Sequence, residues 1–127
     1  MTSQSVGVIG AGQMGNGIAH VFALAGYDVL LTDVNEDALK KALATVTKNL
    51  DRQVKGEKIA EADKAATLDR IKTTLTLTDL GQCDLIIEAA TEKEAVKNAI
   101  FAELLPHLKP ETILTDRKSG SAGMPRP

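Results

Sequence analysis

The stretch Val6-Gly-Val-Ile-Gly-Ala-Gly-Gln-Met-Gly15 joins a short apolar run to a glycine-rich turn near the start of the chain. Its first part, Val6–Ile9, is typical of a buried strand. Behind the glycines a helix is predicted over Gln13–Ala25, and Gly26 is expected to end it. The apolar positions that recur at helical spacing, and that we expect to pack on a sheet, are Ile18, Val21, Phe22 and Ala25. The stretch therefore predicts a strand, a tight turn and a helix.

The glycines of this turn, Gly10, Gly12 and Gly15, match the pattern G-x-G-x-x-G. The first permits the tight turn, and the third lets the helix lie close to the strand. The second lacks a Cβ, so a pyrophosphate can approach the unpaired N–H groups at the helix N-terminus. The alternative is a purely structural glycine turn. The residues of this loop that we predict to bind a dinucleotide are Gly10, Ala11, Gly12, Gln13, Met14 and Gly15.

Asp33 ends a second apolar run, Val29–Thr32, at the distance from the glycines that dinucleotide-binding folds use, about 20 residues. A carboxylate there can accept hydrogen bonds from the adenosine ribose and would repel the 2′-phosphate of NADP. Neither Val34 nor Asn35 supplies a compensating cation. Asp33 therefore predicts NAD as the cofactor, the alternative being an exposed turn aspartate without a ligand.

The rest of the chain alternates helical and strand patterns, as expected of βαβ units. Asn35 can cap a long amphipathic helix whose apolar face carries Leu39, Ala42, Leu43, Val46 and Leu50, opposite Lys41, Lys48, Arg52 and Lys55. Further expected elements are a helix at Ala60–Arg70, a strand at Thr73–Leu77, a turn at Asp79–Gly81, a strand at Leu85–Ala89, a helix at Glu92–Leu105 and a strand at Thr112–Thr115. The predicted fold class is α/β, a Rossmann-type doubly wound, mostly parallel sheet that is truncated after the fifth strand.

Length and composition favour one globular domain, because 127 residues suffice for one core and 43% of them are apolar. The formal net charge of −2 argues against nucleic-acid binding, and the composition argues against a membrane span. A single cysteine and an N-terminus without a signal-peptide pattern favour a reducing compartment, and we expect a cytoplasmic protein.

The other reactive residue types give no persuasive site. Cys83 precedes an apolar run without an activating charge cluster, so we expect an inert thiol that is at least half-buried. His20 and His107 are expected to have surface or packing roles. No His, Cys and carboxylate grouping has a metal-ligand spacing, so we predict neither a metal site nor a catalytic residue within this chain.

Three features together resemble the 3-hydroxyacyl-CoA dehydrogenases, namely Val6–Ala19, Asp33 and the segment Glu88-Ala-Ala-Thr-Glu-Lys-Glu-Ala-Val-Lys97. The resemblance covers about residues 4 to 115. It implies NAD-dependent oxidation of 3-hydroxyacyl-CoA to 3-oxoacyl-CoA in fatty-acid or butyrate metabolism. It also implies that Glu92 and Lys97 lie at the nicotinamide end of NAD. By the same resemblance, the basic helix face with Arg52 and Lys55 corresponds to the surface where the family binds the nucleotide of coenzyme A.

Beyond Thr115 the resemblance weakens, because the family's Ser-Asn-Thr-Ser-Ser segment is replaced here by Asp116-Arg-Lys-Ser-Gly120. We therefore expect an NAD-binding domain at 1–115 and a flexible tail at 116–127. In the family, the catalytic histidine, its paired glutamate and a helical domain follow this point. We expect the chain alone to bind cofactor without turnover, and a protein carrying the helical domain to form a homo-oligomer.

Two other functions are compatible with these residues. The chain could be a stand-alone NAD-binding or regulatory module that needs no catalytic domain. It could also be a fragment of a 3-hydroxyacid or 6-phosphogluconate-type dehydrogenase, whose glycine turn is similar. Asp33 and the segment from Glu92 to Lys97 count against the last.

Overall fold

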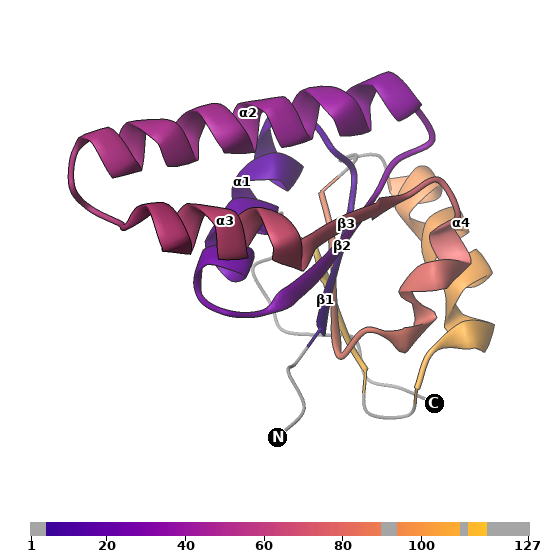
Figure 1. Cartoon of the computed structure of the whole chain (residues 1–127). Coiled ribbons are helices and arrows are strands. Elements are labelled where there is room, and N and C mark those ends of the chain that lie inside the picture. The colour runs from indigo at the N-terminus through magenta and orange to yellow at the C-terminus, as the bar shows by residue number, and fades with distance from the viewer. Residues whose placement is uncertain (1–4, 90–93, 110–111, 117–127) are drawn as a thin grey trace.

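The computed structural model describes residues 5–89, 94–109 and 112–116. In this part of the chain, five parallel strands form one sheet in the order β3-β2-β1-β4-β5 (Figure 1). The strands are β1 (Ser5–Ile9), β2 (Asp28–Thr32), β3 (Ile71–Thr74), β4 (Leu85–Glu88) and β5 (Ile113–Asp116). The chain starts in the middle of the sheet, moves outward to β3, and returns to the other side of β1 as β4. This order confirms the doubly wound α/β fold.

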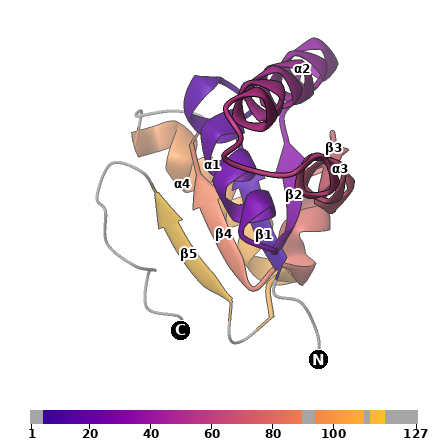
Figure 2. The same ribbon diagram turned by 60° about the vertical axis from the view of Figure 1, so that its left-hand side comes forward.

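Helices cover both faces of the sheet (Figures 1 and 2). One face carries three helices that contact one another, α1 (Gln13–Leu24), α2 (Glu36–Lys55) and α3 (Glu61–Arg70). The other carries α4 (Glu94–Leu104) and two 3-10 helices, η1 (Leu77–Gln82) and η2 (Leu105–His107). Because crossovers between parallel strands are right-handed, connections that leave β1 and β4 toward opposite sheet edges place their helices on opposite faces.

Each face has its own apolar core. The core under α1 and α2 contains side chains of β1, β2 and both helices, among them Val6, Val8, Val29, Leu31, Leu39, Val46 and Leu50. The core under α4 is smaller and consists of Ile9, Leu80, Cys83, Ile86, Phe101 and Leu104. The described helices include none with the combination of length and hydrophobicity that crossing a membrane requires.

Helix α2 is the longest helix among the described residues, and its start is well defined. The Asn35 side chain accepts hydrogen bonds from the backbone N–H groups of Asp37 and Ala38, at 2.9 and 3.3 Å. This confirms the predicted cap. The predicted apolar face is also confirmed, since Leu39, Ala42, Val46 and Leu50 are buried. With 20 residues, α2 extends about 30 Å at 1.5 Å per residue.

The predicted apolar stripe of α1 is wrong in part. Val21 is 65% exposed and Ala25 is also exposed, whereas Ile18 and Phe22 are half-buried against the core. The buried side of α1 is instead formed by Gly15, Asn16, Ala19, His20 and Ala23. Small residues at four-residue spacing let this helix approach the sheet closely, so the helix turns that side inward.

The third strand is also shifted from its predicted range of Thr73–Leu77. It runs over Ile71–Thr74, and its pairing ends where β2 ends, with Thr74 opposite Thr32. The Thr74 hydroxyl then closes a local turn, because it accepts the Thr76 N–H at 3.1 Å and donates to Asp79 at 2.7 Å. Leu77 therefore begins η1, which also contains the predicted turn at Asp79–Gly81.

Candidate functional site

The glycine loop lies at the carboxyl end of the sheet, between the half of the sheet that holds β2 and β3 and the half that holds β4 and β5. Ile9 at the end of β1 is level with Thr32 of β2 on one side and with Glu88 of β4 on the other. From β1 the chain enters α1 on one face, and β4 leads toward α4 on the opposite face. Open α/β sheets bind their ligands in the crevice that such a switch creates.

The first and third glycines make the close turn. Gly10 has a φ of +103°, a conformation that favours glycine, and its N–H donates to the Thr32 carbonyl oxygen at 2.8 Å. A Cβ on Gly15 would lie 2.8 Å from the Gly10 carbonyl carbon and would overlap its oxygen. Helix α1 can therefore begin this close to β1 only with glycine at position 15.

The second glycine faces open space. Gly12 is the N-cap of α1, and the first helical hydrogen bond runs from the Asn16 N–H to the Gly12 carbonyl oxygen at 2.9 Å. Within the described residues no side chain caps this helix start, and its first turn contains no acidic residue. Apart from its own chain neighbours, a Cβ on Gly12 would have no atom of the described chain within 4 Å. Exposed N–H groups and the positive end of the helix dipole thus meet at a surface that an anion can approach.

Asp33 is half-buried beside this loop. Its Oδ2 accepts the Ala11 N–H at 2.9 Å, and its Oδ1 accepts the Asn35 N–H at 3.0 Å. The structure thus brings the predicted loop and the predicted carboxylate together in one hydrogen-bonded unit. A carboxylate has about four lone-pair positions, so acceptor capacity remains on each oxygen for ligand hydroxyls.

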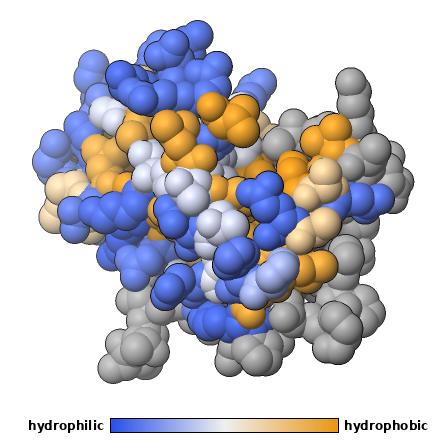
Figure 3. All heavy atoms as spheres, turned by 90° about the vertical axis from the view of Figure 1, so that its right-hand side faces the viewer, coloured by the Kyte–Doolittle hydropathy of each residue, from blue (hydrophilic) through white to orange (hydrophobic). Residues whose placement is uncertain are grey.

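A hollow of about 130 Å³ opens next to Asp33. Its apolar walls come from four separate segments, with Ile9 in β1, Val34 after β2, Leu75 and Leu77 after β3, and Ile100 in α4. Figure 3 faces the α4 side of the molecule and shows apolar surface mostly in the upper half of that face, bordered by hydrophilic surface. Apolar walls with a carboxylate at the rim suit a flat base joined to a sugar.

Sequence reasoning missed these wall residues. The one available signal was an apolar residue, Val34, directly after Asp33. In the structure its side chain is 97% exposed. The other walls could not be assigned because Leu75 and Leu77 were expected inside a strand. Taken together, the open cradle at Gly12, the uncapped start of α1 and the hollow beside Asp33 fit an adenine dinucleotide.

The predicted coenzyme A residues lie elsewhere. Arg52 and Lys55 are exposed in the last turn of α2, about 25 to 30 Å along the helix from its start near Asp33. They line a groove of about 440 Å³ together with Lys48, Asp51, Val54 and Glu61. A hydrogen bond from Lys64 to Asp51 raises the pKa of the Lys64 ammonium group. The groove therefore mixes cations and acids and does not join the glycine loop.

The predicted nicotinamide-end residues can be placed only in part. Glu92 lies outside the described residues. Lys97 lies in α4, but its side chain is outside the described part of the structure. Helix α4 as a whole flanks the crevice, since Ile100 reaches the hollow beside Asp33.

The histidines and the cysteine are held away from this crevice. His20 is buried and its Nε2 lies 2.9 Å from the Gln53 Oε1, which links α1 to α2. His107 is exposed in η2, on the way to the start of β5. Cys83 is buried, as expected, and this burial raises the pKa of its thiol to about 11, which disfavours the reactive thiolate. Among the described residues no three His, Cys, Asp or Glu side chains could hold a metal ion.

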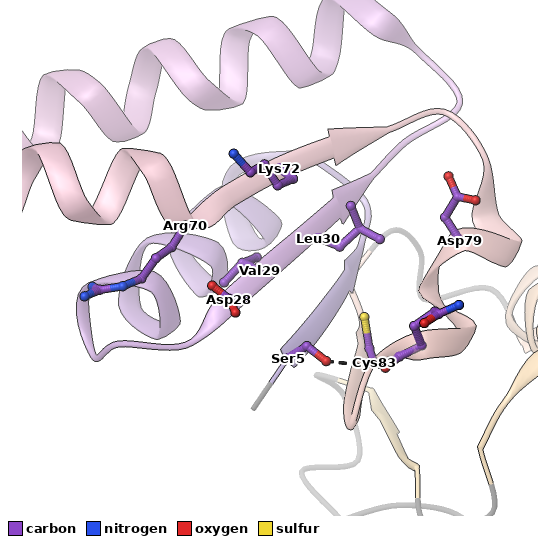
Figure 4. Close-up of a pocket in the computed structure, with 9 residues that line it drawn as sticks. Ser5, Asp28, Val29, Leu30, Arg70, Lys72, Asp79 and Cys83 are labelled. Carbon is purple, nitrogen blue, oxygen red and sulfur yellow. Dashed lines mark hydrogen bonds between the residues drawn. The ribbon is translucent and has the colours of Figure 1, made fainter. Parts of the chain in front are cut away.

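Another groove, larger than the hollow beside Asp33, lies at the opposite end of the sheet. It measures about 390 Å³, and Ser5 and Asp28, the first residues of β1 and β2, line it together with Cys83 and residues of β3 and η1 (Figure 4). Its charges are mixed, because Asp28 and Asp79 line it as well as Lys72. This position is at the amino ends of the strands, away from the crevice.

Comparisons with known proteins agree with this geometry. Residues 5–122 match the family described as "3-hydroxyacyl-CoA dehydrogenase, NAD binding domain". A 3-hydroxybutyryl-CoA dehydrogenase of Bradyrhizobium diazoefficiens is 55% identical over 116 residues, which are 91% of this chain and 40% of the relative. A 3-hydroxyadipyl-CoA dehydrogenase of Escherichia coli is 40% identical over 91% of this chain and 24% of the relative. The chain thus spans about 40% of the length of the first curated relatives it matches.

Solved structures give the same result. The crystal structure of (S)-3-hydroxybutyryl-CoA dehydrogenase from Ralstonia eutropha has a TM-score of 0.85 at 41% identity and covers 91% of this chain and 41% of that chain. That of 3-hydroxybutyryl-CoA dehydrogenase from Escherichia coli has a TM-score of 0.87 at 39% identity, over 91% of this chain and 25% of that chain.

Proposed function

The chain belongs to the family of 3-hydroxyacyl-CoA dehydrogenase NAD-binding domains, and from this membership we propose that its glycine loop and Asp33 hold NAD. Gly10, Ala11, Gly12, Gln13, Met14 and Gly15 form the pyrophosphate side of this site. Asp33 takes the adenosine ribose, and Glu92 and Lys97 take the nicotinamide end. The observation that carries the proposal is Gly12, which faces open space at an uncapped helix start 3 residues before the tightly packed Gly15.

The residues of this chain act on NAD by binding and orienting it. N–H groups at the start of α1 offset the negative charge of the pyrophosphate. The hollow beside Asp33 takes the adenine, with Val34 and Ile100 as walls. When bound, NAD supplies the hydride acceptor. Glu92 and Lys97, which follow β4 in the chain, would hold the nicotinamide end.

The substrate that we propose is a 3-hydroxyacyl-CoA, oxidised to the 3-oxoacyl-CoA in fatty-acid or butyrate metabolism. The named activities of the relatives support this substrate class. Arg52 and Lys55 are exposed cations suited to the phosphates of coenzyme A. Arg52 and Lys55 lie far from the glycine loop, so a substrate that contacts them and also reaches the bound NAD must be long. An acyl-CoA is an extended molecule of this kind.

We further propose that the 127-residue chain binds NAD without turnover of its own. A general base must reach the substrate hydroxyl within hydrogen-bond distance. His20 is packed against Gln53, and His107 follows α4 on the way back to the start of β5. The family resemblance assigns the base to a histidine that follows the segment at residue 115. On the same basis we propose an NAD-binding unit over 1–115, which β5 extends by one residue to Asp116, and a separate tail after it. We also propose a homo-oligomer when a helical domain is present, and a cytoplasmic location.

Calorimetric titration of the chain with NADH, NADPH and a short acyl-CoA tests the binding part. We expect NADH to bind at least about tenfold more tightly than NADPH, because Asp33 bonds to the ribose and repels a 2′-phosphate. Arg52→Ala combined with Lys55→Ala should weaken acyl-CoA binding and leave NADH binding unchanged. Equal affinity for the two cofactors would refute the assigned role of Asp33.

A turnover assay tests the catalytic part. The chain is compared with a fusion to the remaining length of the Bradyrhizobium relative, and NADH production from 3-hydroxybutyryl-CoA is followed at matched concentration. Losing general-base assistance alone removes about 10²- to 10⁴-fold in rate, so we expect turnover from the fusion only. Comparable rates would place a base within residues 1–127 and point to His20 or His107. A chain that binds NADH while the fusion stays inactive would instead favour a stand-alone NAD-binding module.

A further inference from the structure

The carboxylate of Asp33 joins two segments through backbone hydrogen bonds. One oxygen accepts the Ala11 N–H of the glycine loop at 2.9 Å. The other accepts the Asn35 N–H at 3.0 Å, in the turn that starts α2. Ribose recognition needs only the remaining acceptor positions of this group. The two backbone contacts therefore require a separate explanation.

The peptide unit between Gly10 and Ala11 is held from both ends. Its carbonyl oxygen lies against Gly15, where a Cβ would overlap it. Its N–H points to Asp33. A reversed peptide would direct the carbonyl oxygen at the carboxylate and leave the N–H against the helix, so the charge of Asp33 selects the observed orientation.

We propose that Asp33 is a positioning residue for the pyrophosphate-binding loop, in addition to its contact with the adenosine ribose. The proposal rests on the function proposed above. Asp33 holds the Ala11 N–H away from the phosphates and fixes the path of the chain into Gly12, whose N–H begins the anion-binding helix start. Ribose recognition and loop geometry are thus coupled through one side chain. Removing the charge to admit a 2′-phosphate would also loosen the loop.

The variant Asp33→Asn separates the two roles because an amide has one acceptor atom and one donor group. The amide oxygen can replace only one of the two carboxylate contacts. Its NH₂ group would then face either the Ala11 N–H or the Asn35 N–H, which places a donor against a donor. We expect the loop to lose its fixed peptide orientation while the rest of the sheet keeps its fold.

The test uses NADH and an NADH analogue that lacks both hydroxyls of the adenosine ribose, titrated into the chain and into Asp33→Asn. A residue that contacts only the ribose cannot affect binding of the analogue. We expect Asp33→Asn to weaken the analogue by about tenfold, and NADH by about a hundredfold, since two kinds of contact are lost. Asp28→Asn, an exposed aspartate at the other end of β2, is the matched control and should leave both affinities unchanged.

The outcomes distinguish this inference from the proposed function. If the original chain binds NADH and the analogue, but Asp33→Asn binds the analogue as well as the original chain does, the positioning role is overturned and the NAD site stands. If the original chain binds neither ligand, the proposed function fails and this inference fails with it. Weakened analogue binding by Asp33→Asn, with normal binding by Asp28→Asn, supports the coupling.

Amide hydrogen exchange in the unmodified chain gives a second measurement that needs no variant. The Ala11 N–H should exchange much more slowly than the N–H groups of Gly12 and Gln13, because only the first is bonded to Asp33. Its amide proton signal should also shift as the Asp33 carboxylate is titrated with acid. Exchange of Ala11 as fast as that of Gly12, with no acid-dependent shift, would overturn the proposal even if Asp33→Asn did not fold.

Discussion

Two alanine substitutions three residues apart should separate folding from cofactor binding. Gly12→Ala adds a methyl group that, apart from its own chain neighbours, has no atom of the described chain within 4 Å. Gly15→Ala adds the same group 2.8 Å from the Gly10 carbonyl carbon and into its oxygen. The chemical change is identical, so any difference between the variants reports the surroundings of each Cβ.

The expected stability changes follow from these surroundings. At Gly15 the obstacle is backbone, which has to move, and overpacking of this kind costs about 3 kcal/mol. For a domain of this size, that loss corresponds to a melting temperature lower by about 10 °C. At Gly12 the extended backbone, with φ −70° and ψ −166°, accepts alanine. The smaller chain entropy of unfolded alanine and its weaker N-cap preference roughly cancel, so stability should change by less than about 1 kcal/mol.

For NADH binding, the position expected to matter is Gly12, although Gly12→Ala hardly changes stability. The Gly12→Ala methyl group occupies the space through which a pyrophosphate approaches the helix start, so we expect NADH affinity to fall by about tenfold or more in a folded protein. Thermal melts monitored by circular dichroism measure folding, and NADH fluorescence titration measures binding. Gly17→Ala is the control, because it lies inside α1 and its Cβ meets no described atom within 4 Å outside the backbone of that helix and its chain neighbours. It should stabilise the fold by about 0.5 to 1 kcal/mol and bind NADH normally.

Either of two results would refute this reasoning. Normal NADH affinity of Gly12→Ala would show that the open cradle is not the pyrophosphate site. A melting temperature of Gly15→Ala equal to that of the original chain would show that α1 does not approach Gly10 as closely as described.

Three further predictions concern stability. Burial raises the pKa of Cys83 from 9.0 to about 11, so the free energy of unfolding should fall as the pH rises from 9 to 11. In urea titrations Cys83→Ala should flatten this dependence of stability on pH, and an unchanged dependence would contradict the prediction. Arg70→Met removes a 2.8 Å hydrogen bond to the Ala23 carbonyl oxygen at the end of α1, and should cost about 2 kcal/mol by urea unfolding, whereas no loss would mean that water replaces the contact. Glu57 has a φ of +59°, so Glu57→Gly should raise the free energy of unfolding by about 1 kcal/mol and shift the urea midpoint upward. A lowered midpoint would contradict backbone strain at this position.

Local patterns predicted the elements whose signals are local. Gly26 has a φ of +110° and follows the end of α1, as expected of a glycine after a helix. Asn35 caps α2 because its side chain reaches N–H groups two and three residues ahead. Each of these signals acts within a few residues of the chain. The pattern therefore carries the physical cause directly.

Features that depend on a partner segment were not predictable in the same way. The run Thr73–Leu77 has strand character throughout, but the strand begins at Ile71, directly after α3, and ends with β2. Val21 is apolar and lies on the exposed side of α1, since the close approach at Gly15 decides which side faces the sheet. The hollow beside Asp33 combines four segments, so no single window of sequence contains it.

The spacing between the glycines and Asp33 has a geometric cause that the sequence motif alone does not state. Helix α1 has 12 residues and descends about 18 Å along the sheet, at 1.5 Å per residue. Strand β2 has 5 residues and rises about 17 Å, at 3.3 Å per residue. The two lengths nearly cancel, so the chain returns to the level of Ile9, and the parallel register places Thr32 beside it. Asp33 then stands next to Ala11, 22 residues away in sequence, and the 2.9 Å hydrogen bond between them follows from these matched lengths. One extra turn in α1, without a longer β2, would shift Asp33 by about 5 Å and break that bond.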